Sequence, residues 1–188
     1  THEVNETWLT DVKVPVENLV GQENMGWTYA KFLLEHERSG IAQVGRSKRA
    51  IQRIKDIARI EQAYGDKLIN DPAFARKIAE VELELSALEY TELRSLAKEA
   101  QGKGPGPESS LLKIKGTDLQ QACTELAMEA VGYYANPHIN ERIGSNWGVG
   151  PEYSTNLAGN YFNFRKASIY GGSNEIQRNI IAKMVLGL

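Results

Sequence analysis

The stretch Asp71–Leu88, DPAFARKIAEVELELSAL, decides the fold of this 188-residue chain. Asp71 offers a side-chain acceptor for a helix N-terminus, and Pro72 has the backbone φ angle that the first helical turn needs. Beyond them, apolar residues recur every three or four positions, which places them along one face of a helix. These residues are Ile78, Val81, Leu85 and Leu88. A continuous apolar stripe of this kind is typical of a helix inside a bundle.

Further helical patterns lie on both sides of this stretch. Apolar spacing predicts one long helix from Trp27 to Ile57, and another from Glu108 to Gly132, where the glycine ends it. Residues 154–166 form a shorter helical pattern, and a last helix follows Gly171-Gly-Ser-Asn174 and ends at Gly187. The sequence therefore predicts an all-α fold, an antiparallel helical bundle of the four-helix type.

Two segments depart from the helical pattern. Near the start of the chain, Val12, Val14 and Val16 alternate with other residues around Pro15, which predicts a short extended or edge-strand segment before the bundle. Tyr133–Pro151 is rich in glycine and aromatic residues, and an irregular loop of this length is usually functional or interfacial.

The charge balance excludes a global attraction to nucleic acid or to an anionic membrane. The chain has 22 Lys and Arg against 24 Asp and Glu, for a formal net charge of −2. One stretch is densely basic, and we interpret it as a solvated helix, with the steering of phosphate groups as the alternative. Its members are Arg46, Lys48, Arg49, Arg53, Lys55 and Arg59.

Cys123 is the single cysteine, which excludes a disulfide within the chain and a thiolate metal cluster. Its apolar neighbours predict a buried, unreactive side chain, and we expect no metal site. No apolar run reaches the roughly 20 residues that a membrane span requires. These features favour a protein of the cytoplasm with no membrane span.

The closing stretch Ile169–Leu188, IYGGSNEIQRNIIAKMVLGL, resembles the end of the acyl-CoA dehydrogenases. The segments Asp11–Gly21, DVKVPVENLVG, and Asn24–Trp27, NMGW, resemble the passage of that family from its middle β-domain into its C-terminal helices. The resemblance implies that residues 1–22 are the end of the β-domain and a linker, and that residues 23–188 are the C-terminal α-helical domain. We therefore expect the chain to be part of a longer enzyme.

The resemblance also implies a reaction and a set of contacts. The family oxidises an acyl-CoA thioester: a glutamate removes the α-proton, N5 of FAD accepts a hydride from the β-carbon, and an acceptor flavoprotein takes the electrons. Glycines permit close backbone approach, and the start of the last helix offers N–H groups to a dinucleotide. The expected cofactor contacts are Tyr64, Gly172, Ser173 and Glu175, with Arg59 as an additional candidate. The expected substrate contacts are Arg38, Tyr170 and Gly171.

The catalytic base has two candidates. In most members it follows the tyrosine of the closing motif, but here Tyr170 is followed by Gly171, which cannot accept a proton. The isovaleryl- and long-chain branches instead have their glutamate on the first long helix, before an arginine, and Glu37 resembles it. Spacing counted back from Ala63-Tyr-Gly65 leaves Glu35 as the rival. Residues two apart on a helix point roughly 200° from one another, so the two are not interchangeable.

Two cofactor elements of the family are altered. Glu61–Gly65, EQAYG, occupies the place of Arg-x-x-Phe-Gly, whose arginine reaches the FAD pyrophosphate of a neighbouring subunit. Glu129–Tyr133, EAVGY, occupies the place of Gln-x-x-Gly-Gly. A glutamate facing a pyrophosphate is repelled, so either Arg59 replaces the arginine or this subunit does not complete its neighbour's site. The alternative function is therefore a catalytically silent partner subunit that supports FAD on a sister chain. Either function implies a homo- or hetero-oligomer, such as a dimer of dimers.

Overall fold

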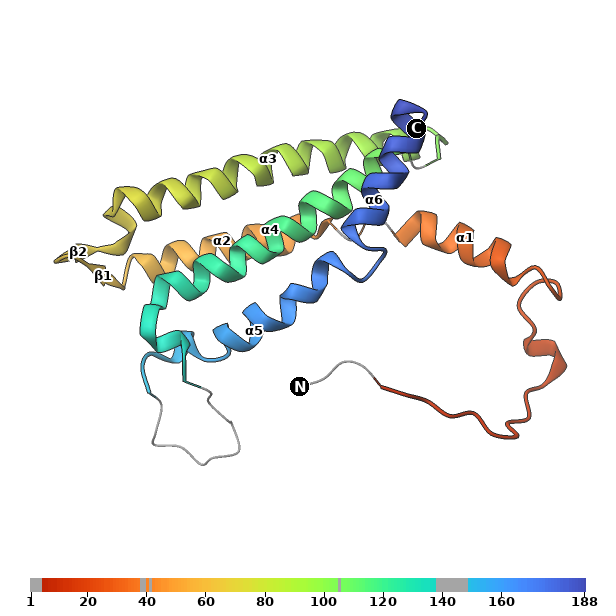
Figure 1. Ribbon diagram of the computed structural model, residues 1–188, viewed down its shortest axis with the longest axis horizontal. Coiled ribbons are helices and arrows are strands. Elements are labelled where there is room, and N and C mark those ends of the chain that lie inside the picture. Colours follow the sequence, from red (N-terminus) through yellow and green to blue (C-terminus); the bar gives the residue numbers. More distant parts are fainter. Residues whose placement is uncertain (1–4, 38–39, 41, 105, 138–148) are drawn as a thin grey trace. The chain divides into compact units, whose positions relative to one another are not determined.

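The computed structural model describes residues 5–37, 40, 42–104, 106–137 and 149–188 (Figure 1). The chain divides into two compact units, Thr1–Glu35 and His36–Leu188. In the first unit, the described residues 5–15 form no strand, and a short 3-10 turn follows at Val16–Asn18. The extended segment predicted before the bundle therefore has no strand partner in the described residues. The predicted boundary between residues 22 and 23 stays a prediction.

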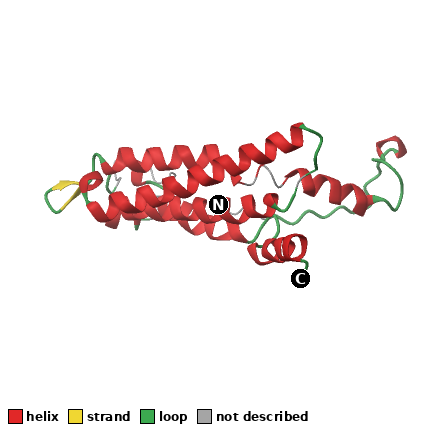
Figure 2. Ribbon diagram, turned by 90° about the horizontal axis from the view of Figure 1, so that it is seen from above, coloured by secondary structure: helices red, strands yellow, loops and turns green. Residues whose placement is uncertain are grey.

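The second unit is a bundle of helices that run up and down in chain order (Figures 1 and 2). Helix α6 crosses the N-terminal half of α4, and the described residues confirm the predicted antiparallel bundle. The long elements of this unit are α2 (Val44–Ala58), α3 (Pro72–Ala100), α4 (Glu108–Val131), α5 (Leu157–Phe164) and α6 (Asn174–Ile181). Helix α1 (Gly26–Glu37) belongs to the first unit except for its last two residues. The short helical turns after α2 are η3 (Leu68–Asn70), η4 (Gly132–Ala135), η5 (Glu152–Ser154), η6 (Arg165–Ser168) and a π turn (Ala182–Leu186).

Three predicted helix ends are confirmed by their caps, whereas the helix predicted at residues 154–166 is shorter, Leu157–Phe164, with a 3-10 turn before and after it. The Asp71 carboxylate accepts a hydrogen bond of 2.7 Å from the Phe74 backbone N–H, and Pro72 is the first residue of α3. Gly132 follows α4 with a φ of 55°, and Gly187 ends the final turn with a φ of 69°. These left-handed conformations suit glycine because it has no Cβ.

The predicted long helix from Trp27 to Ile57 is wrong in one respect. Helix α1 ends at Glu37 and α2 begins at Val44, with Gln43 in the left-handed region at a φ of 47°. A left-handed residue interrupts the helical hydrogen-bond ladder. A hairpin that the sequence did not predict joins α2 to α3: β1 (Gln62–Ala63) pairs antiparallel with β2 (Asp66–Lys67).

The core of the second unit lies between α2, α3 and α4, with α5 covering one side. Its central side chains include Ile54, Phe74 and Leu112, which are almost completely buried. Cys123 is 3% exposed, as predicted, and burial raises the pKa of its thiol to about 11. Among the described residues, no helix combines the length and the apolar character needed to cross a membrane.

Candidate functional site

The loop between η6 and α6 has a backbone that two glycines make possible. Gly171 has a φ of 65° and Gly172 a φ of 81°, both in the left-handed region. A Cβ atom on Gly172 would lie 2.5 Å from Nε2 of Gln177. The loop therefore requires glycine at residue 172 both for its backbone angle and for the close approach of Gln177.

The start of α6 presents hydrogen-bond acceptors. Ser173 is the N-cap, and its hydroxyl oxygen accepts a hydrogen bond of 3.4 Å from the Ile176 backbone N–H. The Glu175 pKa lies below its usual range because of its own backbone N–H, the Ser173 hydroxyl and the cations Arg178 and Lys113. Two N–H groups of this turn thus have partners within the chain. The display of free N–H groups to a dinucleotide stays a prediction for the rest of the turn, which also offers the Glu175 carboxylate.

A buried lysine ties this loop to α4. Lys113 has no solvent exposure, and its ammonium group donates hydrogen bonds to Asn174 Oδ1 at 2.7 Å and to the Ser168 carbonyl at 3.1 Å. Burial lowers the pKa of Lys113, while the carboxylates of Asp118 and Glu175 act in the opposite direction. Lys113 of α4 therefore holds Asn174, the first residue of α6, in place.

A buried glutamine makes a second tie. Gln177 is 1% exposed, and its Oε1 accepts a hydrogen bond of 2.7 Å from the Ser110 hydroxyl. Its Nε2 donates to the Gly171 carbonyl at 3.3 Å. Sequence reasoning missed both Lys113 and Gln177. The available signal was the small polar residues Ser110 and Thr117 on α4, which contact Gln177 and Asn174 of α6, because small side chains allow another helix to approach closely.

The structure brings together only part of the predicted site. Tyr170, Gly171, Gly172, Ser173 and Glu175 share the loop at the start of α6, where the Tyr170 side chain is 44% exposed. The remaining predicted residues lie elsewhere in the chain.

Tyr64 and Arg59 lie near the β1–β2 hairpin, at the opposite end of the bundle from α6 (Figure 1). Tyr64 is fully exposed, and Arg59 forms a 2.6 Å ion pair with Asp56. Both base candidates, Glu35 and Glu37, belong to α1, but their side chains lie outside what the structure describes. Arg38 lies outside the described residues.

Glu61 and Glu129, the two residues that differ from the family's cofactor elements, both have partners within the chain. The Tyr153 hydroxyl donates a 2.7 Å hydrogen bond to Glu61 Oε1. Burial and the neighbouring Glu61 carboxylate raise the pKa of Tyr153 to about 12. Glu129 forms a 2.6 Å ion pair with Lys77 of α3. Among the described residues, no group of three His, Cys, Asp or Glu side chains could hold a metal ion.

The fold and this loop define a member of a known enzyme family. The model of the acyl-CoA dehydrogenase C-terminal domain matches residues 24–186, so the chain belongs to the acyl-CoA dehydrogenases. It is 29% identical to acyl-CoA dehydrogenase FadE26 of Mycobacterium tuberculosis over 99% of this chain and 46% of that protein. The chain therefore spans less than half the length of this relative.

Solved structures share the fold. The chain superposes on the ChsE4-ChsE5 complex from Mycobacterium tuberculosis with a TM-score of 0.76 and 27% identity, over 96% of this chain and 45% of the other. It also superposes on PigA with FAD and proline, with a TM-score of 0.74 and 19% identity, over 95% of this chain and 43% of the other. At that identity, the second comparison supports the fold alone.

Proposed function

We propose that this chain is the C-terminal domain of an FAD-dependent acyl-CoA dehydrogenase that oxidises an acyl-CoA thioester between its α and β carbons. Glu37 removes the α-proton, and FAD, when held by Gly172, Ser173 and Glu175, would supply the acceptor for the hydride. An acceptor flavoprotein then takes the electrons, in the cytoplasm. One observation carries the proposal. In a chain that belongs to the family, the loop at residues 169–173 has a conformation that requires glycine, and Lys113 and Gln177 hold it in place.

The loop suits particular parts of the cofactor. Gly171 and Gly172 allow the backbone to approach a flat ring closely. Because Ser173 and Glu175 present oxygen acceptors, they suit the hydroxyl groups of FAD better than its phosphates. Tyr170 and Arg38 would contact the acyl-CoA.

The base is tested in the full-length enzyme by anaerobic reduction of the flavin with a panel of acyl-CoAs. We expect Glu37→Gln to slow bleaching of the flavin band by about 10² to 10⁴, the usual effect of removing a general base. Glu35→Gln, which changes the neighbouring carboxylate in the same way, should bleach like the wild type. Both variants must retain their flavin. If only Glu35→Gln fails, Glu35 is the base.

A second candidate function is a silent partner subunit. It is favoured by the hydrogen bond from Tyr153 to Glu61, because the family's arginine at this place reaches a neighbour's FAD. The ion pair of Glu129 with Lys77 likewise engages the residue that stands in place of the family's glutamine. A relative of known structure is a complex of two chains, ChsE4-ChsE5. Purified full-length protein that lacks flavin, and becomes active only after co-expression with a sister chain, would favour this candidate over the first.

A further inference from the structure

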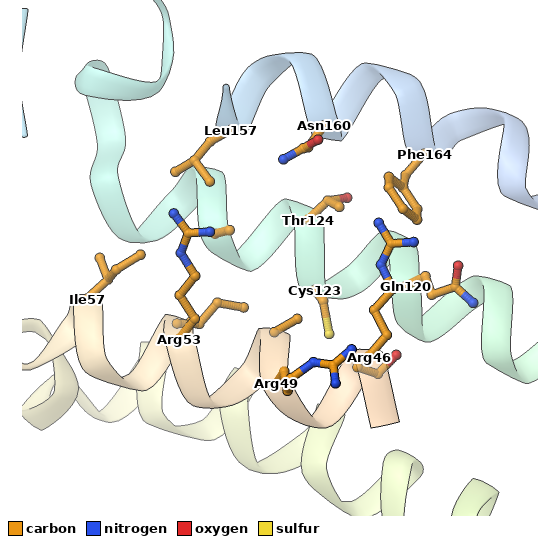
Figure 3. A pocket seen from close by; sticks show the side chains of 14 residues that line it. Arg46, Arg49, Arg53, Ile57, Gln120, Cys123, Thr124, Leu157, Asn160 and Phe164 are labelled. Carbon is orange, nitrogen blue, oxygen red and sulfur yellow. The ribbon is translucent and has the colours of Figure 1, made fainter. Parts of the chain in front are cut away.

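The basic stretch of α2 divides into two groups in the structure. Three of its members form ion pairs: Lys48 with Glu89 at 2.5 Å, Lys55 with Glu82 at 2.5 Å and Arg59 with Asp56 at 2.6 Å. The other three are Arg46, Arg49 and Arg53, which line a groove between α2, α4 and α5 (Figure 3). Five of the six side chains are exposed and Lys55 is half-buried, as predicted for a solvated helix, but among the described residues only the first group is paired with carboxylates.

The groove has one sign of charge and an apolar floor. Its volume is about 370 Å³, within the usual range for small-molecule sites. Among the described residues, its lining holds three arginines and no aspartate or glutamate. The apolar lining residues are Ala50, Ile54, Ile57, Cys123, Ala127, Leu157 and Phe164. A ligand that matches this surface has an anionic group beside an apolar body.

The arginines keep donors available for such a group. Figure 3 shows Arg46 and Arg53 extending from α2 toward α5 on either side of Cys123 and Thr124. The Arg46 guanidinium lies 4.5 Å from the centre of the Phe164 ring and donates to Gln43 Oε1 at 3.3 Å. One nitrogen of Arg53 donates to the Tyr153 carbonyl at 3.4 Å. Because each guanidinium has five N–H donors, these contacts leave several free to bind an anion.

The groove also contains a buried hydroxyl, that of Ser47, without a hydrogen-bond partner in the described residues. Ser47 lines the groove, is 2% exposed, and its Oγ has no hydrogen-bond partner in the described part of the chain. A buried hydroxyl without a partner is costly, so most such groups in proteins are paired. A ligand oxygen in the groove would satisfy it.

We propose that this groove binds a small amphipathic anion, a carboxylate or phosphate ester with an apolar body. The anionic group lies among Arg46, Arg49 and Arg53, and the apolar body lies on the floor near Cys123 and Leu157. The site shares no residue with the loop at the start of α6 and takes no part in the proposed dehydrogenation. Its test is therefore independent of that function.

The test uses the flavin-bound full-length protein and two fluorescent dyes, anilinonaphthalene sulfonate and its uncharged analogue N-phenyl-1-naphthylamine. We expect the sulfonate to bind about tenfold more tightly than the neutral dye, with the flavin spectrum unchanged. The double variant Arg49→Gln/Arg53→Gln should lose about tenfold in affinity for the sulfonate. The control Arg76→Gln removes an exposed arginine of α3 and should leave the affinity unchanged.

Competitors identify the natural headgroup. Displacement of the sulfonate by octanoate indicates a carboxylate ligand, and displacement by octyl phosphate indicates a phosphate ester. Circular dichroism melting confirms that each variant is folded. Equal binding of the neutral dye, full affinity in the double variant, or displacement by neither competitor would overturn the proposal.

The Ser47 hydroxyl gives a second readout. Ser47→Ala removes a buried group without a partner, so the unliganded variant should melt a few degrees higher than the wild type. The same change should weaken sulfonate binding about threefold, because the ligand loses a hydrogen bond. Unchanged melting together with unchanged affinity would contradict the assignment of this hydroxyl to the site.

Discussion

At the scale of single residues, Lys113 holds the loop between η6 and α6 against α4. Lys113→Met leaves Asn174 Oδ1 and the Ser168 carbonyl without their donor, so we expect the variant to lose about 2 kcal/mol in the free energy of unfolding. Chemical denaturation of the full-length protein measures this loss. Lys115→Met is the matched control, because Lys115 is an exposed lysine of the same helix and pairs with Glu84. Equal losses in the two variants would contradict the role given to Lys113.

The pH dependence of the free energy of unfolding, compared between the wild type and Lys113→Met, tests the burial of the Lys113 charge. Because the folded pKa of Lys113 is lowered, the unfolded chain binds more protons just below the ordinary lysine pKa. The free energy of unfolding of the wild type should therefore rise with pH in that window, relative to Lys113→Met. Parallel pH curves for the two proteins would mean that the lysine pKa is the same in the folded and unfolded chains.

For Tyr153, the predicted change of stability with pH has the opposite sign. The folded chain keeps its phenol proton up to about pH 12, whereas an unfolded tyrosine loses it near pH 10. The unfolded state thus binds fewer protons between these values, and the contribution of Tyr153 to stability falls as pH rises. Absorbance at alkaline pH should detect one late-titrating tyrosine that Tyr153→Phe abolishes. That variant should also lose about 1 kcal/mol at neutral pH with its hydrogen bond to Glu61.

At the scale of elements, the backbone of α4 packs closely against the segment before α2. A Cβ atom on Gly116 would lie 2.6 Å from Ala42 Cα and 2.8 Å from its carbonyl oxygen, so the backbone must move. We expect Gly116→Ala to cost about 1 to 3 kcal/mol in thermal or chemical unfolding. Gly159→Ala in α5 is the control, because a Cβ added there would meet no atom of the described residues within 4 Å. It should stabilise by about 0.5 kcal/mol, and a loss in this control would show that glycine replacement itself is harmful.

Local signals explain which elements the sequence could predict. The start of α3 at Asp71 and Pro72 and the end of α4 at Gly132 were predictable, because caps depend on residues adjacent in the sequence. The break before α2 was not, because Gln43 takes a left-handed conformation that glutamine rarely adopts. Two hydrogen bonds join α4 to α6, from Lys113 to Asn174 and from Ser110 to Gln177, and their partners lie 61 and 67 residues apart in the sequence. No local pattern predicts such a contact.

The candidate site was predictable to different extents. The loop residues Gly171 to Glu175 were identified through their resemblance to a family motif, and the fold agrees with that family. The partners of the altered positions were not predictable, because Glu61 meets Tyr153 and Glu129 meets Lys77 only after the helices pack. The choice between Glu35 and Glu37 stays open, since it depends on which face of α1 meets the substrate.

At the scale of the whole molecule, Glu61 distinguishes the two functions proposed for this chain. If two copies complete each other's FAD sites, the Glu61 carboxylate lies near a neighbour's pyrophosphate and weakens FAD binding. Glu61→Arg then removes a repulsion and adds a charge-assisted hydrogen bond, so the full-length protein should bind FAD at least about tenfold more tightly. Equilibrium dialysis against FAD measures the change. Tyr153→Phe is the control, because it removes the partner of Glu61 but leaves its negative charge. If Glu61→Arg does not change FAD affinity, position 61 does not face a neighbour's cofactor, as expected of a subunit that depends on a sister chain.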